Sequence, residues 1–584
     1  MEMNNTHTDL KKYYPWVLLG IGILSLVALL GLAFFHTKGE PREAVVALSM
    51  LNSGDWISPV NNGVDIAYKP PFFHWCVAIV SWVLGGVTEF SSRLPSAVAT
   101  IAMTLVAWNA MRRNGVDART NMLTGLLTLS TFEVHRAAMA CRVDMLLSAL
   151  IVIAVYMLHS WNTTRRRLYV LWAVAAMSGA VLTKGPVGAL LPLGIIGAYR
   201  LVKGYGFFKI VGLCMLLLLS SLVLPFIWYY MAYLERGDAF LYLVFEENIL
   251  RFTGKMVYAS HEASAFYNVV SLATGFLPYT LLLLLALLSR RYRWHCRFSA
   301  FSWRKCGSWG DRQWKRIRQM PSQDLLSLLS VAVIFVFYCI PKSKRSVYLL
   351  PLYPFLAYYL ARFLMWLSST RRRLVVVYGW TLVGVLAILV LLMVVIKAGL
   401  VPATLFNGKH AMENQLYLES LEQTHWFLVL LPLAITILLV WGFRKWSAMG
   451  NFALSVAVTF IVLSVYFALD TTVLPRVYEV KSDYNVARQI AYLVPRGKIW
   501  DYRKDFRPGE RNRMHQFTVN FYLGDRIQPL DLEMPSNGYM IMGDDDLEPF
   551  RRSHPSYRLK SIQRFDHRSC DDKRQLTLYK FVKD

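Results

Sequence analysis

The residues that could do chemistry are a few carboxylates and cations in short polar stretches beside long apolar runs. Glu40 and Arg42 follow the first apolar run, Lys69 precedes a Pro-Pro pair, and Asp144 begins another apolar run. A carboxylate can orient or deprotonate an attacking group, and cations can stabilise a departing phosphate. We therefore take Glu40 and Asp144 as candidate catalytic groups. For Asp144, an ion pair with Arg142 or a helix N-cap is an equal alternative.

Further cations stand where two apolar runs meet. The turn at 341–348 holds Lys342, Lys344 and Arg345, followed by Tyr348. On the outer side of a membrane these cations would oppose the positive-inside bias, and a bound anion such as a phosphate would explain them. A solvated charge run is the alternative. Lys184, in a Thr-Lys-Gly-Pro motif, either holds a phosphate or extends its ammonium to the membrane interface.

The stretch 232–265 carries Arg251, His261 and Glu262. His261 with a neighbouring carboxylate would suit a divalent metal ion, so His261 is a candidate ligand. An exposed loop histidine without a metal is the commoner reading of such a pair.

Long apolar runs must position these groups. Hydrophobic residues make up 55% of the chain and charged residues only 17%, below the roughly 25% of soluble domains. The segments 16–35 and 374–396 contain no charged residue and are long enough to cross a bilayer core of about 30 Å. The seven cysteines are scattered. The composition excludes disorder, a disulfide scaffold and a simple secreted enzyme.

We expect an α-helical polytopic membrane protein with about thirteen transmembrane helices. The expected spans lie near 16–35, 94–111, 121–137, 143–161, 168–184, 186–202, 207–231, 266–289, 324–340, 347–366, 374–396, 426–443 and 450–470. A further apolar stretch, 72–88, is ambiguous.

Basic clusters decide how 72–88 is read. They lie at 112–113, 165–167, 200–203, 290–318, 371–373 and 444–445. If 72–88 lies along the membrane surface, all of them share the side of Lys11 and Lys12, as the positive-inside bias requires. The N-terminus is then inside and the C-terminus outside. Most of the net charge of +26 is explained by topology, and the split basic groups argue against nucleic-acid binding.

The predicted membrane domain covers 1–473, with outer loops at 36–93 and 232–265. Residues 474–584 are densely charged and predict a small soluble α/β domain outside the membrane. Within it we expect a helix at 482–493 and strands at 498–502, 517–523, 539–542 and 576–581.

Several short motifs recur in one order. They are Glu-Pro-Arg at 40–42, Ser-Gly-Asp-Trp at 53–56, Lys-Pro-Pro at 69–71, Arg-Leu-Pro-Ser at 93–96, Asp-Met at 144–145, Thr-Lys-Gly-Pro at 183–186, Pro-Lys-x-Lys at 341–344 and Leu-Pro at 350–351. In this order the chain resembles the GT-C membrane glycosyltransferases of the aminoarabinose-transferase and protein O-mannosyltransferase superfamily.

The resemblance implies an inverting glycosyltransferase in a bacterial inner membrane, with a periplasmic C-terminal domain. Its donor would be a polyprenyl-phosphate-linked sugar and its acceptor lipid A, a glycolipid, a glycan or a protein. Lys69 would bind the carrier phosphate, and Arg42 and Arg251 occupy matching positions. His261 matches a histidine that binds a divalent metal ion in some members. The segment 72–88 matches a juxtamembrane helix.

One position departs from the family's pattern. The first loop usually reads Asp-Glu-x-Arg, and its Asp is the proposed catalytic carboxylate, whereas this chain has Gly39 there. Either Glu40 has taken over, or Asp144 supplies the carboxylate, or the acceptor needs less activation, or the chain is an inactive homologue.

A transporter or flippase of a lipid-linked anion is the competing class. Such a protein should place polar groups near the bilayer midplane, and charges within the apolar runs are nearly absent. A polysaccharide polymerase or ligase shares the donor chemistry but usually has a large outer loop between spans.

Overall fold

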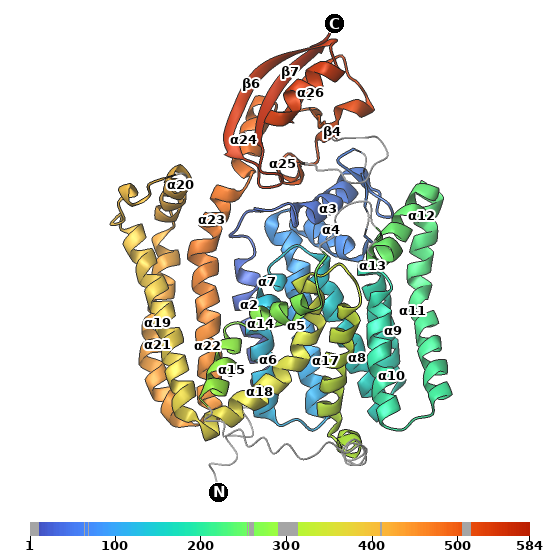
Figure 1. Ribbon diagram of the computed structural model, residues 1–584, viewed down its shortest axis with the longest axis vertical. Coiled ribbons are helices and arrows are strands. Elements are labelled where there is room, and N and C mark those ends of the chain that lie inside the picture. The colour runs from blue at the N-terminus through green and yellow to red at the C-terminus, as the bar shows by residue number, and fades with distance from the viewer. Residues whose placement is uncertain are drawn as a thin grey trace, which may run out of the picture.

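The structure is a computed structural model that describes residues 11–63, 65–67, 69–253, 255, 262–289, 313–408, 411–504 and 516–584. It consists of a bundle of long helices and a small domain with a β-sheet. Figure 1 shows that this domain covers one end of the bundle, directly above α3 and α4.

Most of the described chain is helical. The helices of the bundle and its loops are α2 (Tyr14–Ser25), α3 (Pro41–Ser53), α4 (Phe72–Leu84), α5 (Glu89–Arg113), α6 (Ala118–Ser130), α7 (Phe132–Ala138), α8 (Val143–Thr164), α9 (Arg167–Lys184), α10 (Val187–Val202), α11 (Phe207–Arg236), α12 (Asp238–Phe245), α13 (Arg251–Thr253), α14 (Phe266–Gly275), α15 (Tyr279–Leu288), α17 (Ser322–Cys339), α18 (Tyr353–Thr370), α19 (Arg372–Lys397), α20 (Ala411–Glu422), α21 (Trp426–Met449), α22 (Asn451–Ala468) and α23 (Leu474–Lys481). A 3-10 helix, Ser346–Leu352, precedes α18, and β1 (Val60–Asn61) pairs with β2 (Asp65–Ile66) in the first loop.

Many of these helices are long and apolar enough to span a membrane. In the described part of the chain, eight helices meet that description, or nine if the bent pair α14 and α15 forms one span. Three shorter apolar helices are Tyr14–Leu29, Phe72–Leu84 and Val187–Val202. Every predicted span contains helical structure, although the helical part of 16–35 ends at Leu29, and the helical membrane fold is confirmed. A total of about thirteen crossings stays a prediction.

The basic clusters that were predicted to share one side contact one another or their neighbouring turns. These contacts are Arg113 over the ring of Tyr169 (5.3 Å), Lys203 Nζ to the carbonyl of Arg318 (3.2 Å), Arg371 Nη1 to Ser289 Oγ (2.5 Å) and Arg372 Nη1 to Asn451 Oδ1 (3.1 Å). The ring of Tyr14 lies 6.4 Å from that of Phe452, which joins the start of α2 to the same end. The structure therefore gathers these clusters at the end of the bundle opposite the sheet domain (Figure 1).

Both ends of α4 lie at the end that carries the sheet domain. His74 in its first turn contacts Glu43 of α3, and Glu89, just after α4, accepts a hydrogen bond from Tyr522 of the sheet domain. A helix that begins and ends at one end of a bundle does not cross it. The prediction that 72–88 does not span is confirmed.

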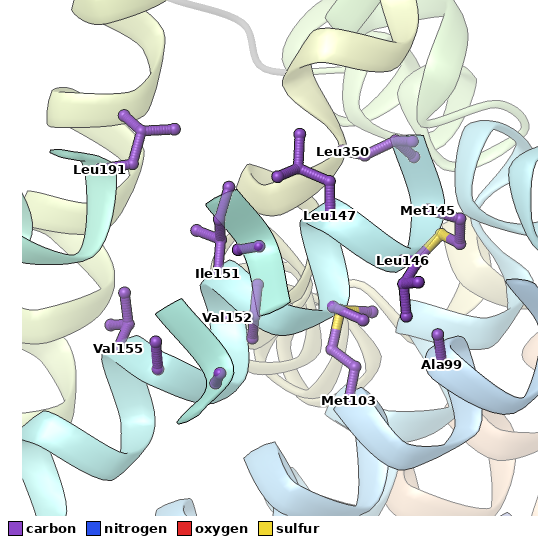
Figure 2. Packing of buried hydrophobic residues seen from close by; sticks show 14 of the residues in the cluster. Ala99, Met103, Met145, Leu146, Leu147, Ile151, Val152, Val155, Leu191 and Leu350 are labelled. Carbon is purple, nitrogen blue, oxygen red and sulfur yellow. The ribbon is translucent and has the colours of Figure 1, made fainter. Parts of the chain in front are cut away.

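The core of the bundle is built around α8. Figure 2 shows Met145, Leu146, Leu147, Ile151, Val152 and Val155 of α8 beside side chains of the surrounding elements, with Ala99 and Met103 of α5 nearby. Most residues of α8 are buried between its neighbours, whereas most of the equally apolar α11 is exposed on the outside of the bundle. Packing against α5, α9 and α10 therefore holds the start of α8, where Asp144 stands, in one place.

The sheet domain has five strands in the order β4-β3-β5-β7-β6. They are β3 (Ile499–Asp501), β4 (Ile527–Pro529), β5 (Asn537–Gly543), β6 (Tyr557–Arg568) and β7 (Gln575–Lys583), with helices α24 (Tyr484–Leu493), α25 (Phe517–Tyr522) and α26 (Leu547–Ser553). The pairs β3–β4 and β3–β5 are parallel, and β5–β7 and β6–β7 are antiparallel. The predicted helix 482–493 and the strands at 498–502, 539–542 and 576–581 are confirmed, whereas β4 and β6 were not predicted.

The predicted strand 517–523 is wrong, because these residues form α25. Its alternation of Phe517, Val519 and Phe521 with polar residues fits a strand, but both sets of side chains are buried. Thr518 donates from its backbone N and its Oγ1 to Asp571, at 2.8 Å each. These long-range hydrogen bonds satisfy the buried polar groups of Thr518 in a helical turn, so tertiary contacts override the strand pattern.

The predicted domain boundary after residue 473 falls inside a helical run. A π-helical turn, Leu469–Val473, joins α22 to α23, so helix continues to Lys481 before the sheet domain begins.

Candidate functional site

Glu40 is bound on both carboxylate oxygens. Arg93 donates from Nε to Oε1 at 2.8 Å and from Nη2 to Oε2 at 3.1 Å, and the backbone N of Cys141 donates to Oε1 at 2.9 Å. Glu40 is only 6% exposed. Burial would raise the pKa of Glu40, but the charge and hydrogen bonds of Arg93 hold it below its usual value. These contacts link the start of α3 to α5 and favour a structural role for Glu40 over the predicted catalytic one.

Glu43, which was not among the predicted site residues, is the carboxylate that faces the cations of the first loop. Lys69 Nζ donates to Oε1, His74 Nε2 lies 3.0 Å from Oε2, and Arg42 Nη2 lies 3.3 Å from Oε1. Glu43 is 2% exposed. Burial would raise its pKa, but the Lys69 ammonium, the hydrogen bond from His74 and the Arg42 charge hold the pKa of Glu43 well below its usual range.

The sequence does contain a signal for Glu43. Pro41 stands at the first position of α3, where proline is favoured, so the Glu-Pro-Arg-Glu motif predicts a helix whose first turn contains Glu43. A carboxylate in the first turn of a helix is stabilised by the helix dipole. What the motif cannot show is that Lys69 and His74 lie against it.

Asp144 pairs with Lys184 rather than with Arg142. Lys184 Nζ donates to Asp144 Oδ1 and lies 4.4 Å from the ring centre of Tyr348, a cation–π distance. The ring of Tyr348 stacks on that of Tyr338 at 5.5 Å. The N-cap position of α8 is Arg142, so Asp144 is not the N-cap. Three predicted site residues, Asp144, Lys184 and Tyr348, therefore meet in one place.

Lys69 connects this pair to Glu43. Burial lowers the pKa of Lys69, and both the Glu43 and the Asp144 carboxylates oppose that shift. Lys69 thus lies close enough to Glu43 and Asp144 for both negative charges to act on its pKa. The loop before α4, the first turns of α3 and α4, the start of α8 and the end of α9 meet in a single cluster of ionisable side chains, which we call the ion cluster (Arg42, Glu43, Lys69, His74, Asp144 and Lys184). Glu43 and His74 are buried, and the other four are partly buried.

Arg142, at the N-cap of α8, occupies the space beside Gly39. A Cβ built on Gly39 would collide with the guanidinium of Arg142. A side chain at position 39 would have to displace Arg142. The resemblance predicts an Asp carboxylate at position 39. In this chain the guanidinium of Arg142 lies where that side chain would be.

Other predicted phosphate ligands have different partners. Lys344 is 5% exposed and donates to the carbonyls of Pro341 and Cys339 at the end of α17, the latter at 3.4 Å. The carbonyl of Lys342 accepts from the N of Ala263 at 3.3 Å. These contacts favour a structural role for Lys344.

Arg345 and Arg251 lie in two other segments. Arg345 Nε is buried and has no hydrogen-bond partner within the described residues. Arg251 Nη1 donates to Glu247, one helical turn earlier. A Cβ built on Gly185 would collide with Asn248 Oδ1, which shows that the 246–251 segment lies directly against the end of α9. The predicted phosphate-binding roles of Arg42, Lys69, Lys184, Arg251, Lys342, Lys344, Arg345 and Tyr348 stay predictions.

The sheet domain holds α3 from above. Phe35 N donates to Tyr522 Oη at 3.0 Å, Ser49 Oγ donates to Asp525 Oδ2 at 2.5 Å, and Asn52 Nδ2 donates to the carbonyl of Gly524 at 3.2 Å. These contacts join the turn after α25 to the helix that carries Glu43.

Comparisons with known proteins show which sequences and folds the chain is similar to. Residues 46–235 match the family of dolichyl-phosphate-mannose-protein mannosyltransferases. A protein of undescribed function from Aquifex aeolicus is 25% identical over 91% of this chain and 92% of its own length. The undecaprenyl phosphate-alpha-4-amino-4-deoxy-L-arabinose arabinosyl transferase of Pseudomonas aeruginosa (strain LESB58) is 28% identical over 49% of this chain and 51% of its own length. The chain thus spans about half the length of that relative.

The crystal structure of ArnT from Cupriavidus metallidurans bound to undecaprenyl phosphate matches 96% of this chain and 97% of that one, with a TM-score of 0.66 and 21% identity. The chain thus shares its fold with this membrane protein, and about a third of its length matches the mannosyltransferase family. These matches confirm the resemblance seen in the motifs and the multi-pass membrane fold. The region that matches the mannosyltransferase family, 46–235, contains Lys69, Asp144 and Lys184 but begins after Glu43.

The predicted metal ligand His261 lies outside the described residues. Within the described ranges, one group of three side chains has its ligand atoms close enough to hold a metal ion: Asp483, Cys570 and Asp571, all buried in the sheet domain. Asp483 accepts from Ser569 Oγ at 2.8 Å and Asp571 accepts from Thr518. Protein donors thus satisfy this group, and the divalent metal ion stays a prediction.

Proposed function

We propose that this protein transfers a sugar, with inversion, from a polyprenyl-phosphate carrier to an acceptor at the outer face of a bacterial inner membrane. One observation carries the proposal: a partly buried cluster of cations and carboxylates lies at one end of an apolar helix bundle. A lipid-linked donor cannot leave the bilayer, so its phosphate must meet polar groups at the membrane boundary. The sheet domain, at the same end, is then periplasmic.

The ion cluster contains the groups that the reaction needs. The acceptor's oxygen or nitrogen would attack the anomeric carbon, and the bond from that carbon to the phosphate oxygen would break. Lys69 and Lys184 are placed to stabilise the negative charge that develops on the departing phosphate. Asp144 is placed to orient Lys184 or the acceptor.

The relatives suggest which substrates to test first. The donor named for the Pseudomonas relative is an undecaprenyl phosphate-linked aminoarabinose. We propose the same donor for this chain, with lipid A as the first acceptor and protein hydroxyl groups as the second.

The test is transfer by the purified full-length protein in lipid nanodiscs. Undecaprenyl-phosphate-linked aminoarabinose and lipid A are supplied, and the mass of lipid A is measured. We expect an added sugar with the wild-type protein and about 100-fold less with Lys69→Ala, because the leaving phosphate loses a charge-assisted donor. The matched control is Lys203→Ala, which removes a lysine at the opposite end of the bundle.

A protein that moves labelled carrier lipid across the membrane but adds no sugar to lipid A or to protein would contradict the proposal. Mass analysis of surface glycolipids and glycoproteins from a deletion strain gives an independent reading, because a missing sugar identifies the natural acceptor.

A further inference from the structure

The carboxylate of Glu43 and a phosphate group would compete for the same cations. Lys69 donates to Glu43, and Arg42 lies 3.3 Å from the same oxygen, Oε1. Both cations belong to the ion cluster. An anionic phosphate that enters this cluster must share them with Glu43.

Glu43 keeps a different partner on its second oxygen. His74 Nε2 lies 3.0 Å from Oε2, and the ring is 1% exposed in the first turn of α4. The Nδ1 atom of His74 has no hydrogen-bond partner within the described residues. His74 is therefore fixed by packing and by Glu43, and it would hold the carboxylate in position after a cation left Oε1.

The charges of the cluster are consistent with such an exchange. Arg42, Lys69 and Lys184 contribute three positive charges, while Glu43 and Asp144 contribute two negative ones. Glu40 is neutralised by Arg93 and does not enter this balance. A phosphate would bring its negative charge to the two cations that now contact Glu43.

We propose that Glu43 is the carboxylate that receives the acceptor's proton, and that the donor phosphate activates it by drawing Lys69 and Arg42 away from Oε1. This proposal rests on the proposed sugar transfer. Without donor, two cations keep Glu43 ionised and weakly basic. With donor bound, Oε1 is released to accept a hydrogen bond from the acceptor.

The chemical step balances within these groups. The acceptor O–H or N–H gives its proton to Oε1 of Glu43, and its lone pair forms the new bond to the anomeric carbon. The carbon–oxygen bond to the phosphate breaks, and its electron pair leaves with the polyprenyl phosphate, held by Lys69. The proton on Glu43 passes to water when the products leave and Lys69 returns.

The exchange makes a prediction that a purely structural role does not. In Glu43→Gln, Lys69 loses the carboxylate to which it donates, so undecaprenyl phosphate should bind several-fold more tightly than to the wild type. Sugar transfer should fall about 100-fold or more, because the proton acceptor is gone. A structural role would weaken binding and transfer together.

The affinity for undecaprenyl phosphate and the rate of sugar transfer are both measured on the full-length protein in nanodiscs, with undecaprenyl phosphate as the binding probe. Asp324→Asn is the matched control, because Asp324 is also paired with an arginine (Arg362) but lies at the opposite end of the bundle. It should change neither phosphate affinity nor transfer.

The outcomes separate the two proposals. If the wild type binds undecaprenyl phosphate but transfers no sugar, the proposed function fails, and tighter binding by Glu43→Gln still supports the exchange. Unchanged transfer or weaker phosphate binding by Glu43→Gln overturns the role of Glu43. If that variant does not fold, Glu43→Asp decides, since its shorter carboxylate should keep wild-type phosphate affinity and lose most of the transfer, and full transfer would overturn the proposal.

Discussion

At the scale of single residues, the site is made of charges that depend on one another. Lys184 is held by Asp144 and by the ring of Tyr348, and Lys69 is held by Glu43. Removing one partner of a buried pair leaves the other charge uncompensated, which costs more than the pair contributes. Substitutions here must therefore be judged by binding and turnover together.

Lys184→Ala should weaken the binding of undecaprenyl phosphate by about 10-fold, because one charge-assisted contact of about 1.5 kcal/mol is lost. Asp144→Asn should leave that affinity equal or higher, since it frees Lys184. Binding of the lipid phosphate to each purified variant checks both expectations. Equal weakening in Lys184→Ala and in the Lys203→Ala control would contradict the placement of Lys184 in the site.

Glu40→Gln should destabilise the protein by about 3–5 kcal/mol, because Arg93 is left as a buried charge with one weaker acceptor. Arg93 also donates to the carbonyls of Leu30 and Ala33, so the loss loosens the connection from α2 to α3. Thermal unfolding of the detergent-solubilised variant measures the effect. An unfolding temperature equal to that of the wild type would show that Glu40 is not a structural anchor.

At the scale of elements, α3 matters most because it is held on two sides. The first turn of α4 contacts it at Glu43, and the turn after α25 contacts it at Ser49 and Asn52. The helix that carries the proposed proton acceptor is therefore positioned by a domain whose sequence lies more than 400 residues away. A small error in such positioning is costly for catalysis.

Asp525→Ala should lower sugar transfer although Asp525 lies outside the ion cluster. Its carboxylate accepts from Ser49 Oγ, from the N of Asn62 and from Asn520 Nδ2. Losing these contacts leaves Asn52 as the remaining hydrogen bond described above between α3 and the sheet domain, so we expect transfer to fall about 10-fold and proteolysis between the domains to become faster. Asp584→Ala, at an exposed pair in the same domain, is the control. Wild-type transfer by Asp525→Ala would mean that the sheet domain does not position α3.

At the scale of the whole molecule, the two ends of the bundle differ in chemistry. One end gathers the basic turns, and the other carries the ion cluster and the sheet domain (Figure 1). Lys and Arg in short loops set orientation in the membrane. The basic end is therefore expected in the cytoplasm and the sheet domain in the periplasm.

Cysteine labelling in intact cells tests this orientation. A membrane-impermeant maleimide should react with Arg551→Cys, on the surface of the sheet domain, in cells whose outer membrane alone is permeable. Arg165→Cys, in an exposed turn at the basic end, should react only after the inner membrane is opened. The reverse pattern would place the sheet domain in the cytoplasm and contradict the proposed function.

The sequence by itself determined the helical membrane fold, the separate C-terminal domain and the non-crossing helix at 72–88. These follow from apolar runs and basic clusters that are local in the chain, and the burial of a charge in a bilayer is costly whatever the tertiary structure. Lys69, Asp144 and Lys184 could also be singled out, because each is a charge beside an apolar run.

Only the tertiary structure decided which charges meet. Glu40 and Glu43 are three residues apart, yet one neutralises Arg93 and the other faces Lys69 and His74. Likewise, the alternation at 517–523 predicts a strand, but Asp571 binds Thr518 and favours a helix. The pairing of a buried ion or hydrogen bond depends on what another element brings within about 3 Å, and no local pattern contains that distance.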